Sequence, residues 1–411
     1  MQKFIFIFIF SILLAVELPI GFTDEEWDNR YLIETMGRQT DPPVSPIRNI
    51  AEYEPMQGAL IRYPFGISTS IIKEIAEDLK VYCLVSSGLQ NSAYNSMSNA
   101  DVNMDNVEFI LGNTDSYWTR DYGPWWIVDG NGDIGIVDFT YNRPRPNDND
   151  APLKVANHLN VSYYSADFVS TGGNYMTDGF GTSAATQIAY TENNECNTNN
   201  DTSVPLPSCN YVDNIMEEYY GVDEYHVVAD PNNEYIDHID CWAKFLSPTK
   251  MLIRSVPTSH SQYDQIEEIV DYFDNNTAFN IFRVYTPNDQ PYTNSLILNE
   301  KVFVPVMNSS WDDEALDVYQ DALPDYDIIP FTGSWMSTDA LHCRIKGIPD
   351  ISMYEYSLGD INQDSLINIQ DVILVVNLLL NNEYSNIADL NSDNILNVLD
   401  VILLVNLIIG S

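Results

Sequence analysis

The chain has 411 residues, which is more than one compact domain usually needs, so we expect a large domain with an appendage. Sixty acidic residues against 18 basic ones give a formal net charge of −42, which leaves too few cations to bind a nucleic acid. Hydrophobic residues make up 45% of the chain and aromatic residues 12%, a composition that excludes a disordered polypeptide and supports a packed core.

The beginning of the chain has the pattern of a signal peptide. One cation precedes a short apolar run over 4–15, which Glu17 then interrupts, and this run is too short to span a membrane. We therefore expect residues 1–20 to be a signal peptide, the protein to be secreted, and no transmembrane segment. Export permits disulfides, and Cys196 and Cys209, which bracket an Asn-rich loop, could form one.

The body of the chain mixes strand and helix patterns. Strand-like apolar runs lie at 58–63, 81–85, 125–128, 134–139, 251–255, 295–298 and 302–306. Amphipathic helical patterns lie at 70–79, 262–273 and 313–322. Their alternation predicts an α/β domain of several βα units over residues 21–357.

The first segment that could bind a ligand or take part in catalysis is Trp118-Thr-Arg-Asp-Tyr-Gly-Pro-Trp-Trp126. It sets the carboxylate of Asp121 among aromatic rings, and aromatic faces attract flat cations such as guanidinium groups. The alternative is that the tryptophans pack in the core and that Arg120 pairs with a neighbouring acid.

The second segment, Tyr235-Ile-Asp-His-Ile-Asp-Cys-Trp242, combines a histidine with carboxylates. If this segment is extended, His238 and Asp240 share one face, because side chains alternate along a strand. Burying such a pair is costly unless it has a partner or a function. The alternative is a structural His–Asp pair in the core.

Cys343, in Asp339-Ala-Leu-His-Cys-Arg, is a candidate nucleophile, although a lone cysteine is more often buried and inert. On a strand its neighbour His342 would face away from it, so His238 is the better candidate base. Cys343, His238 and two carboxylates together suit one specific reaction. The carboxylates bind a planar guanidinium, the thiolate attacks its central carbon, and the histidine protonates the departing ammonia.

The last 52 residues contain a repeat. Two 12-residue loops carry oxygen side chains at the same five positions, as in calcium-binding loops, and position 7 would add a backbone carbonyl. Each loop runs into an apolar helix, at 372–380 and 401–409. The alternative is a pair of polar turns that cap two core helices. The predicted ligands are Asp360, Asn362, Asp364, Leu366, Asn368 and Asp371 in the first loop, and Asp389, Asn391, Asp393, Ile395, Asn397 and Asp400 in the second.

Both parts resemble known families. The segments Trp118-Thr-Arg-Asp-Tyr-Gly-Pro-Trp, Asn142-Arg-Pro-Arg-Pro-Asn-Asp, Gly172-Gly-Asn-Tyr-Met-Thr-Asp, Tyr235-Ile-Asp-His-Ile-Asp-Cys-Trp, Tyr292-Thr-Asn-Ser-Leu-Ile-Leu-Asn and Ala340-Leu-His-Cys-Arg resemble, in the same order, the bacterial secreted peptidylarginine deiminases. These belong to the guanidine-modifying, or pentein, superfamily. The resemblance implies a five-bladed pseudosymmetric α/β propeller and no organic cofactor. An immunoglobulin-like domain follows the catalytic part in that family, and it is replaced here.

The resemblance also implies a role for each matched residue. Cys343 would be the nucleophile and His238 the general acid and base, with Asp121 and Asp240 holding the guanidinium. The other implied residues are Asn294 in the site, Trp118 and Tyr235 lining the pocket, and Arg143 and Arg145 gripping the C-terminal carboxylate of a peptide. Two guanidinium groups two residues apart can converge on one carboxylate, whereas the alternative is a pair of surface cations.

The tail, residues 358–411, resembles the type I dockerin module, although position 12 is aspartate and no helix precedes either loop. This implies a small all-α domain, two calcium ions and a cohesin module of a scaffold protein as partner. The leading hypothesis is thus a secreted deiminase of C-terminal arginine in peptides or proteins, tethered to a scaffold. The alternatives are an agmatine deiminase and a non-catalytic module that binds guanidinium groups.

Overall fold

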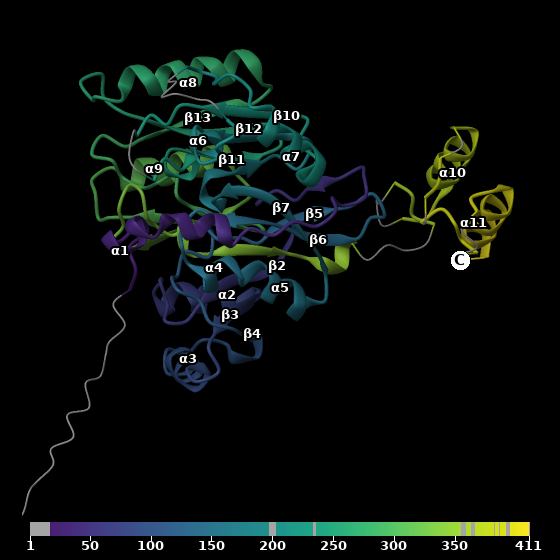
Figure 1. Cartoon of the computed structure of the whole chain (residues 1–411), viewed down its shortest axis with the longest axis horizontal. Helices are drawn as coiled ribbons and strands as arrows, with labels where there is room; N and C mark the ends of the chain where they lie inside the picture. Colours follow the sequence, from purple (N-terminus) through teal and green to yellow (C-terminus); the bar gives the residue numbers. More distant parts are fainter. Residues whose placement is uncertain are drawn as a thin grey trace, which may run out of the picture.

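The computed structural model describes residues 17–196, 203–232, 236–354, 359–362, 366–381, 383–385, 387–391 and 395–410. In this part of the chain, five small sheets repeat one plan (Figure 1). An outer strand pairs antiparallel with a central strand, which pairs parallel with the next strand along the chain. Two of the sheets carry one extra strand at an edge.

The strands, given sheet by sheet, are β1 (Arg48–Asn49), β5 (Trp125–Val128), β6 (Ile134–Tyr141) and β7 (Ser162–Ser170); β8 (Met176–Thr177), β9 (Thr182–Thr186) and β10 (Glu224–Val228); β11 (Ala243–Ser247), β12 (Lys250–Ser255) and β13 (Asn280–Tyr285); β14 (Leu296–Leu298), β15 (Lys301–Val306) and β16 (Asp327–Thr332); and β17 (Lys346–Pro349), β2 (Met56–Arg62), β3 (Lys80–Val85) and β4 (Val107–Leu111). The last body strand, β17, pairs with β2, so one sheet joins the two ends of the body.

Helices cross over between the parallel strands of each sheet. These crossovers contain α2 (Thr69–Asp78), α3 (Gln90–Ser98), α4 (Pro146–Asn149), α5 (Ala151–Leu159), α6 (Ile188–Thr191), α7 (Asn210–Tyr220), α8 (Tyr263–Asn276) and α9 (Asp312–Ala322), and α1 (Asp24–Asp28) precedes the first strand. In α2, the buried residues recur at helical spacing and pack in the core. All the predicted strands and helices of the body correspond to observed elements, which confirms the predicted α/β class.

The predicted cysteine pair forms a disulfide. Cys196 and Cys209 are bonded, with their Cα atoms 5.4 Å apart. The other three cysteines are free and buried, and they include Cys343. Within the described ranges, no helix has both the length and the apolar character needed to cross a membrane. The predicted leader lies outside these ranges except for residues 17–20, so the signal peptide remains a prediction.

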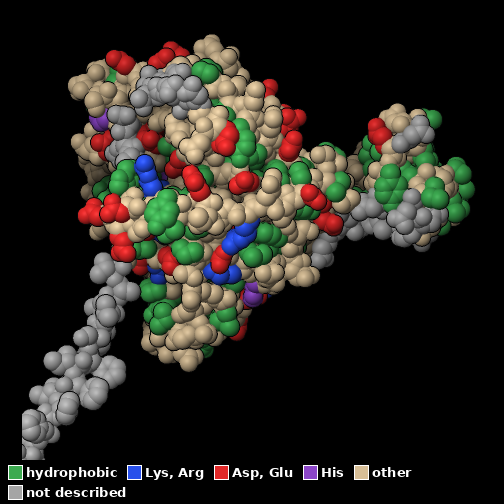
Figure 2. Space-filling model, viewed as in Figure 1, with side chains coloured by type: hydrophobic (Ala, Val, Ile, Leu, Met, Phe, Trp, Pro, Cys, Tyr) green, Lys and Arg blue, Asp and Glu red, His purple; other side chains and the backbone are tan. Residues whose placement is uncertain are grey.

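The C-terminal region contains two helices, α10 (Ile369–Asn381) and α11 (Val398–Gly410), which pack on each other around Val375, Ala388 and Leu404. Figure 1 shows them beside the body. Both begin three residues before the predicted starts, because Asp371 and Asp400 lie in the first turn of each helix. Figure 2 shows hydrophobic side chains over the visible face of this pair and acidic ones scattered over the body.

Candidate active site

The five predicted catalytic residues come from separate segments and are all buried. Asp121 lies in the loop before β5, Asn294 precedes β14, and Cys343 lies in the 3-10 turn His342–Arg344 before β17. His238 immediately precedes a second 3-10 turn, Ile239–Cys241, which carries Asp240. None of the five side chains belongs to a residue that is more than 5% exposed.

Short distances connect these residues. The amide of Asn294 lies 3.3 Å from the Cys343 sulfur, and an Asp240 carboxylate oxygen lies 4.0 Å from it. On the other side, His238 Nδ1 lies 3.7 Å from Asp121 Oδ1. The predicted set therefore converges on one buried place. The condition of an extended segment is not met, because the chain turns at Ile239–Cys241, so the argument from alternating faces does not apply.

Burial and mutual charge set the protonation of the site. Burial raises the pKa of the Cys343 thiol well above its ordinary value, and the charges of Asp240 and Asp121 add to this effect. Burial also lowers the pKa of His238 to about 4, so its imidazole is neutral near neutral pH. Burial, and then the charge of Asp240, raise the pKa of Asp121 well above its usual range.

Asp240 behaves differently from Asp121. Burial raises its pKa, but the hydrogen bond and charge of His342, together with the charges of His238 and Lys244, outweigh burial, so the pKa lies below its usual value. Asp121 Oδ1 and both ring nitrogens of His238 have no hydrogen-bond partner among the described residues. Buried polar atoms of this kind are costly unless a ligand satisfies them. Two carboxylates beside a neutral imidazole suit a cation that donates several hydrogen bonds.

Gly173 makes room for this arrangement. A Cβ atom at this position would lie 2.5 Å from His238 Nδ1 and 2.7 Å from Asp121 Oδ1. The 3-10 turn Gly172–Asn174 therefore approaches the site so closely that only glycine fits. Sequence reasoning left this turn without a definite role.

Gly173→Ala should lower kcat/KM for guanidine hydrolysis about 100-fold, because it would push His238 and Asp121 out of position. The matched control is Gly88→Ala, since a Cβ at Gly88 would meet nothing within 4 Å. Steady-state kinetics and thermal unfolding of both variants test this. Equal activity of the two folded variants would contradict it.

Trp118 lies at the site as predicted. It is 2% exposed, donates a hydrogen bond from Nε1 to Asp339 at 3.1 Å, and packs in one apolar cluster with Ile20, Ile236 and Cys343. Tyr235, the other predicted pocket residue, lies outside the described residues. Asp339, for which the sequence suggested no role, thus orients the indole of Trp118.

The predicted carboxylate grip, Arg143 and Arg145, is buried and already has partners. Arg145 bonds both carboxylate oxygens of Glu26, at 2.6 and 3.1 Å, and its Nη2 donates to the carbonyls of Pro19 and Gly21. Arg143 donates to the carbonyl of Ile20 at 3.2 Å. The alternative of two surface cations is therefore wrong, and the sequence had not indicated that residues near the start of the chain reach this site.

A second buried layer was also missed. His342 does not face away from the site, because it lies in a turn rather than on a strand. Its Nδ1 lies 2.6 Å from Asp240 Oδ2 and its Nε2 lies 2.5 Å from Glu52 Oε2. Glu52 also pairs with Arg120 and Lys244, each at 2.9 Å. Nothing in the local sequence of Glu52 indicated this role.

The predicted calcium loops are described only in part, since Asp364 and Asp393 lie outside the described residues. In both loops the aspartate at position 12 accepts backbone N–H groups: Asp371 accepts from Ile361, Asn362 and Asn368, and Asp400 from Leu390 and Asn397. Within the described ranges, no group of three or more His, Cys, Asp or Glu residues is placed to hold a metal ion. Both loops nonetheless carry hard oxygen donors at equivalent positions, which is the ligand type that calcium prefers.

Comparisons with known proteins agree with the geometry of the body. A model of the Porphyromonas-type peptidyl-arginine deiminase family matches residues 66–349. A putative agmatine deiminase of Mycoplasma capricolum is 25% identical over 308 residues, which is 64% of this chain and 80% of that protein. A putative agmatine deiminase of Yersinia pestis is 24% identical over 290 residues, or 59% of this chain and 77% of that protein.

Solved structures share the fold. The agmatine deiminase of C. jejuni superposes with a TM-score of 0.61 at 20% identity, covering 74% of this chain and 96% of that one. A putative arginine deiminase from Porphyromonas gingivalis gives a TM-score of 0.64 at 17% identity, covering 74% of this chain and 98% of that one. The body therefore has a pentein-like α/β fold.

Proposed function

The chain belongs to the Porphyromonas-type peptidyl-arginine deiminase family and is a cysteine-dependent hydrolase of guanidines, and on this premise we propose that it converts the C-terminal arginine of peptides to citrulline. The observation that carries the proposal is the convergence of a thiol, two carboxylates and a neutral imidazole in one buried site. Carboxylates bind a planar guanidinium by charge-assisted hydrogen bonds, and the thiol beside them supplies the nucleophile.

The first half-reaction begins when the guanidinium of the substrate enters between Asp121 and Asp240. Its charge offsets the two carboxylates that keep the pKa of Cys343 high, so the thiol ionises and neutral His238 takes the proton. The sulfur attacks the central carbon of the guanidinium. His238 then returns the proton to the departing nitrogen, ammonia leaves, and a thiouronium remains on Cys343.

The second half-reaction hydrolyses this intermediate. A water molecule gives a proton to His238 and adds its oxygen to the same carbon. The carbon–sulfur bond breaks, His238 returns its proton to sulfur, and the ureido group leaves once its hydroxyl proton has passed to the ammonia or to solvent. Each turnover consumes one water and releases one ammonia per arginine. No organic cofactor takes part in these steps.

We assign the C-terminal carboxylate of the substrate to Arg143 and Arg145. Support comes from Glu26, since Arg145 bonds its carboxylate through both Nε and Nη2, the paired geometry that suits a carboxylate. Agmatine has no carboxylate, so it would gain nothing from this pair. The pair therefore favours arginine at a peptide C-terminus over agmatine.

Arg143→Ala should lower kcat/KM for a peptide that ends in arginine about 100-fold, while kcat/KM for agmatine changes about twofold or less. The reason is the loss of a cation for the peptide carboxylate, which agmatine lacks. Arg283→Ala is the control, because Arg283 pairs with Glu267 and should leave both values unchanged. Equal losses on both substrates would contradict the assignment.

Agmatine deiminase is the second candidate function, and the names of the relatives favour it. Assays of the wild-type enzyme distinguish the two candidate functions. Equal turnover of agmatine and of peptides ending in arginine would support the second candidate. Binding of both without any ureido product would instead support a non-catalytic guanidinium-binding module.

We further infer that the five sheet units close into a five-bladed propeller around Cys343. The pairing of β17 with β2 supports this, because it joins the ends of the body in one sheet. The site residues also come from loops between several of these units. Secretion is part of the proposal as well, and the Cys196–Cys209 disulfide supports it because such bonds persist in oxidising compartments.

The C-terminal region is proposed to be a dockerin-like module that binds two calcium ions and a cohesin partner. The predicted ligands in the two loops supply hard oxygens, the ligand type that calcium prefers. Exposed apolar residues on α10 and α11 support docking, among them Ile373, Leu380, Val398 and Ile402.

Calorimetric titration of the full chain should show about two calcium ions per chain. Asp360→Ala should remove about one of them, because it deletes the first ligand of one loop only. Asp350→Ala, a carboxylate before these loops, should leave the stoichiometry unchanged. Binding of no calcium by the wild-type chain would contradict the module.

A further inference from the structure

The start of the described chain packs against the side chains around Cys343. We call residues 17–26 the N-terminal segment. Ile20 is 8% exposed and packs with Trp118, Ile236 and Cys343 in one apolar cluster. Cys343 itself has no exposed surface, so a substrate can reach it only if something moves.

The polar contacts of the N-terminal segment fall on the two arginines. Its carbonyls at Pro19, Ile20 and Gly21 accept hydrogen bonds from Arg143 or Arg145, as described above. The Glu26 carboxylate takes the bidentate position on Arg145. Backbone carbonyls and a carboxylate are also what a peptide substrate would present to the same two arginines.

A groove of about 560 Å³ continues from these contacts to the surface. One side is lined by the start of the chain, including Phe22 and Trp27, and the other by the body, including Arg143 and Ile236. Its volume suits a small ligand or a few peptide residues. The start of the chain therefore lines a groove beside Arg143 and Ile236.

We propose that Trp118, Arg143 and Arg145 form a peptide-binding cleft, that the N-terminal segment is its intramolecular ligand in the chain that keeps residues 17–20, and that substrate peptides displace it. This rests on the proposed function and adds to it how peptides are recognised. A tethered ligand is present at high effective concentration, so it lowers the fraction of chains that can accept a substrate and raises the apparent KM.

Full-length Ile20→Asp/Glu26→Gln should show an apparent KM for peptides ending in arginine about tenfold below wild type, with kcat nearly unchanged. Glu26→Gln alone should give a smaller decrease. Glu25→Gln is the matched control, because this substitution makes the same charge change on α1 at a residue that is exposed to solvent. An unchanged or raised KM in the double variant would overturn the proposal.

A binding measurement decides the matter without catalysis. A fluorescent synthetic peptide of residues 17–28 should bind the double variant, and unlabelled peptide ending in arginine should displace it. The same peptide should bind wild type more weakly, because the N-terminal segment competes. No binding to the double variant would overturn the inference, whereas absence of ureido product from every variant would overturn the proposed function alone.

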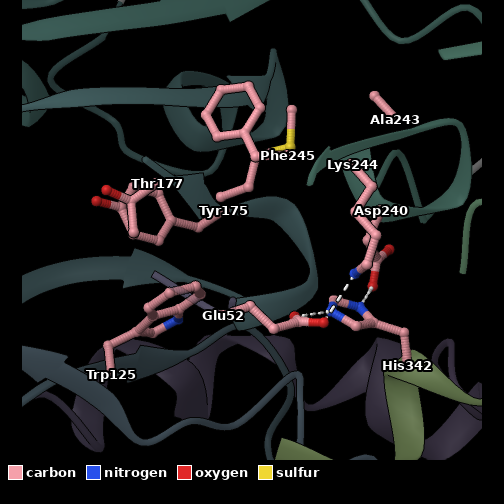
Figure 3. A pocket seen from close by; sticks show the side chains of 10 residues that line it. Glu52, Trp125, Tyr175, Thr177, Asp240, Ala243, Lys244, Phe245 and His342 are labelled. Atoms are coloured by element: carbon pink, nitrogen blue, oxygen red, sulfur yellow. Dashed lines mark hydrogen bonds and ion pairs between the residues drawn. The ribbon is translucent and has the colours of Figure 1, made fainter. Parts of the chain in front are cut away.

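A separate observation concerns the layer behind Asp240. Figure 3 shows Glu52, His342, Lys244 and Asp240 linked in one chain of contacts. They border an enclosed cavity of about 30 Å³, which is too small for a substrate. Glu52 is held on both sides, since Arg120 and Lys244 pair with it.

We propose that Glu52 is a positioning residue that acts through His342 on Asp240. His342 Nδ1 holds one Asp240 oxygen, and Glu52 holds the opposite ring nitrogen, so the ring cannot turn away. The backbone of the same residue is also fixed, because His342 N donates to Asn294 Oδ1 at 3.0 Å. Asp240 is thereby aimed at the guanidinium before a substrate arrives.

A double-mutant cycle tests this in the Cys343→Ser background, where binding is measured without turnover. Glu52→Gln should weaken the Kd of a peptide ending in arginine about tenfold, and this effect should largely disappear when Asp240→Asn is also present. Glu52→Asp should retain part of the affinity, and it decides the question if Glu52→Gln unfolds. Glu54→Gln, which changes a carboxylate that pairs with Arg48, is the control. Equal losses with and without Asp240→Asn would overturn the proposal.

Discussion

Cys343→Ser is expected to abolish deimination, with a loss in kcat of about 10⁴-fold or more. A serine hydroxyl in this buried site cannot ionise as a thiol does when a guanidinium binds. Ureido formation from a peptide ending in arginine, followed colorimetrically, measures the loss.

Cys83→Ser is the matched control for that variant. Cys83 is also fully buried and free, and burial likewise raises the pKa of its thiol to about 12, but it lies on β3 away from the site. The control should retain deimination even if the protein is somewhat less stable. Residual activity of Cys343→Ser near the wild-type level would show that another group attacks the guanidinium.

Asp240→Asn is expected to change two reactions of Cys343 in opposite directions. Deimination should fall about 10³-fold, because the guanidinium loses an ionised, hydrogen-bonded partner. Alkylation of Cys343 by iodoacetamide should become faster at about pH 8, because the charge of Asp240 helps to keep the thiol pKa high. Unfolding would also slow deimination and expose the buried thiol, so alkylation of the equally buried Cys83 is followed in the same variant and should stay slow.

The pH dependence of alkylation tests whether the pKa of the Cys343 thiol is raised. A thiol with a raised pKa gains about tenfold in thiolate for each pH unit below that pKa, so the wild-type rate should keep rising through about pH 9 without levelling. In Asp240→Asn the curve should level at a lower pH. Asp237→Asn, which alters a carboxylate bonded to Gln187, should match wild type in both reactions. A wild-type rate that levels off below about pH 8 would contradict the account.

Sequence patterns predicted the α/β class and those body elements that are strongly amphipathic or apolar. The α2 helix, for example, could be located from its buried face alone. The faces of His238 and His342 could not be predicted, since an alternating pattern was assumed where the chain forms 3-10 turns. A turn of three residues leaves little periodic signal.

The candidate site was likewise only partly predictable from the sequence. Asp121, His238, Asp240, Asn294 and Cys343 were identified because their segments resemble a family, while their convergence depends on contacts between distant parts of the chain. Glu52 and the N-terminal segment have no such local signature. Ile20 was assigned to a leader because its surroundings are apolar, yet that same character lets it pack against Trp118 and Cys343.

The most direct test of the central claim is the stoichiometry of products from a peptide that ends in arginine, incubated with the wild-type full-length chain. The account predicts equal amounts of ureido group and ammonia, a rate well above that for agmatine, and no product with Cys343→Ser. Ammonia without a ureido group, or product formation that does not depend on Cys343, would contradict it.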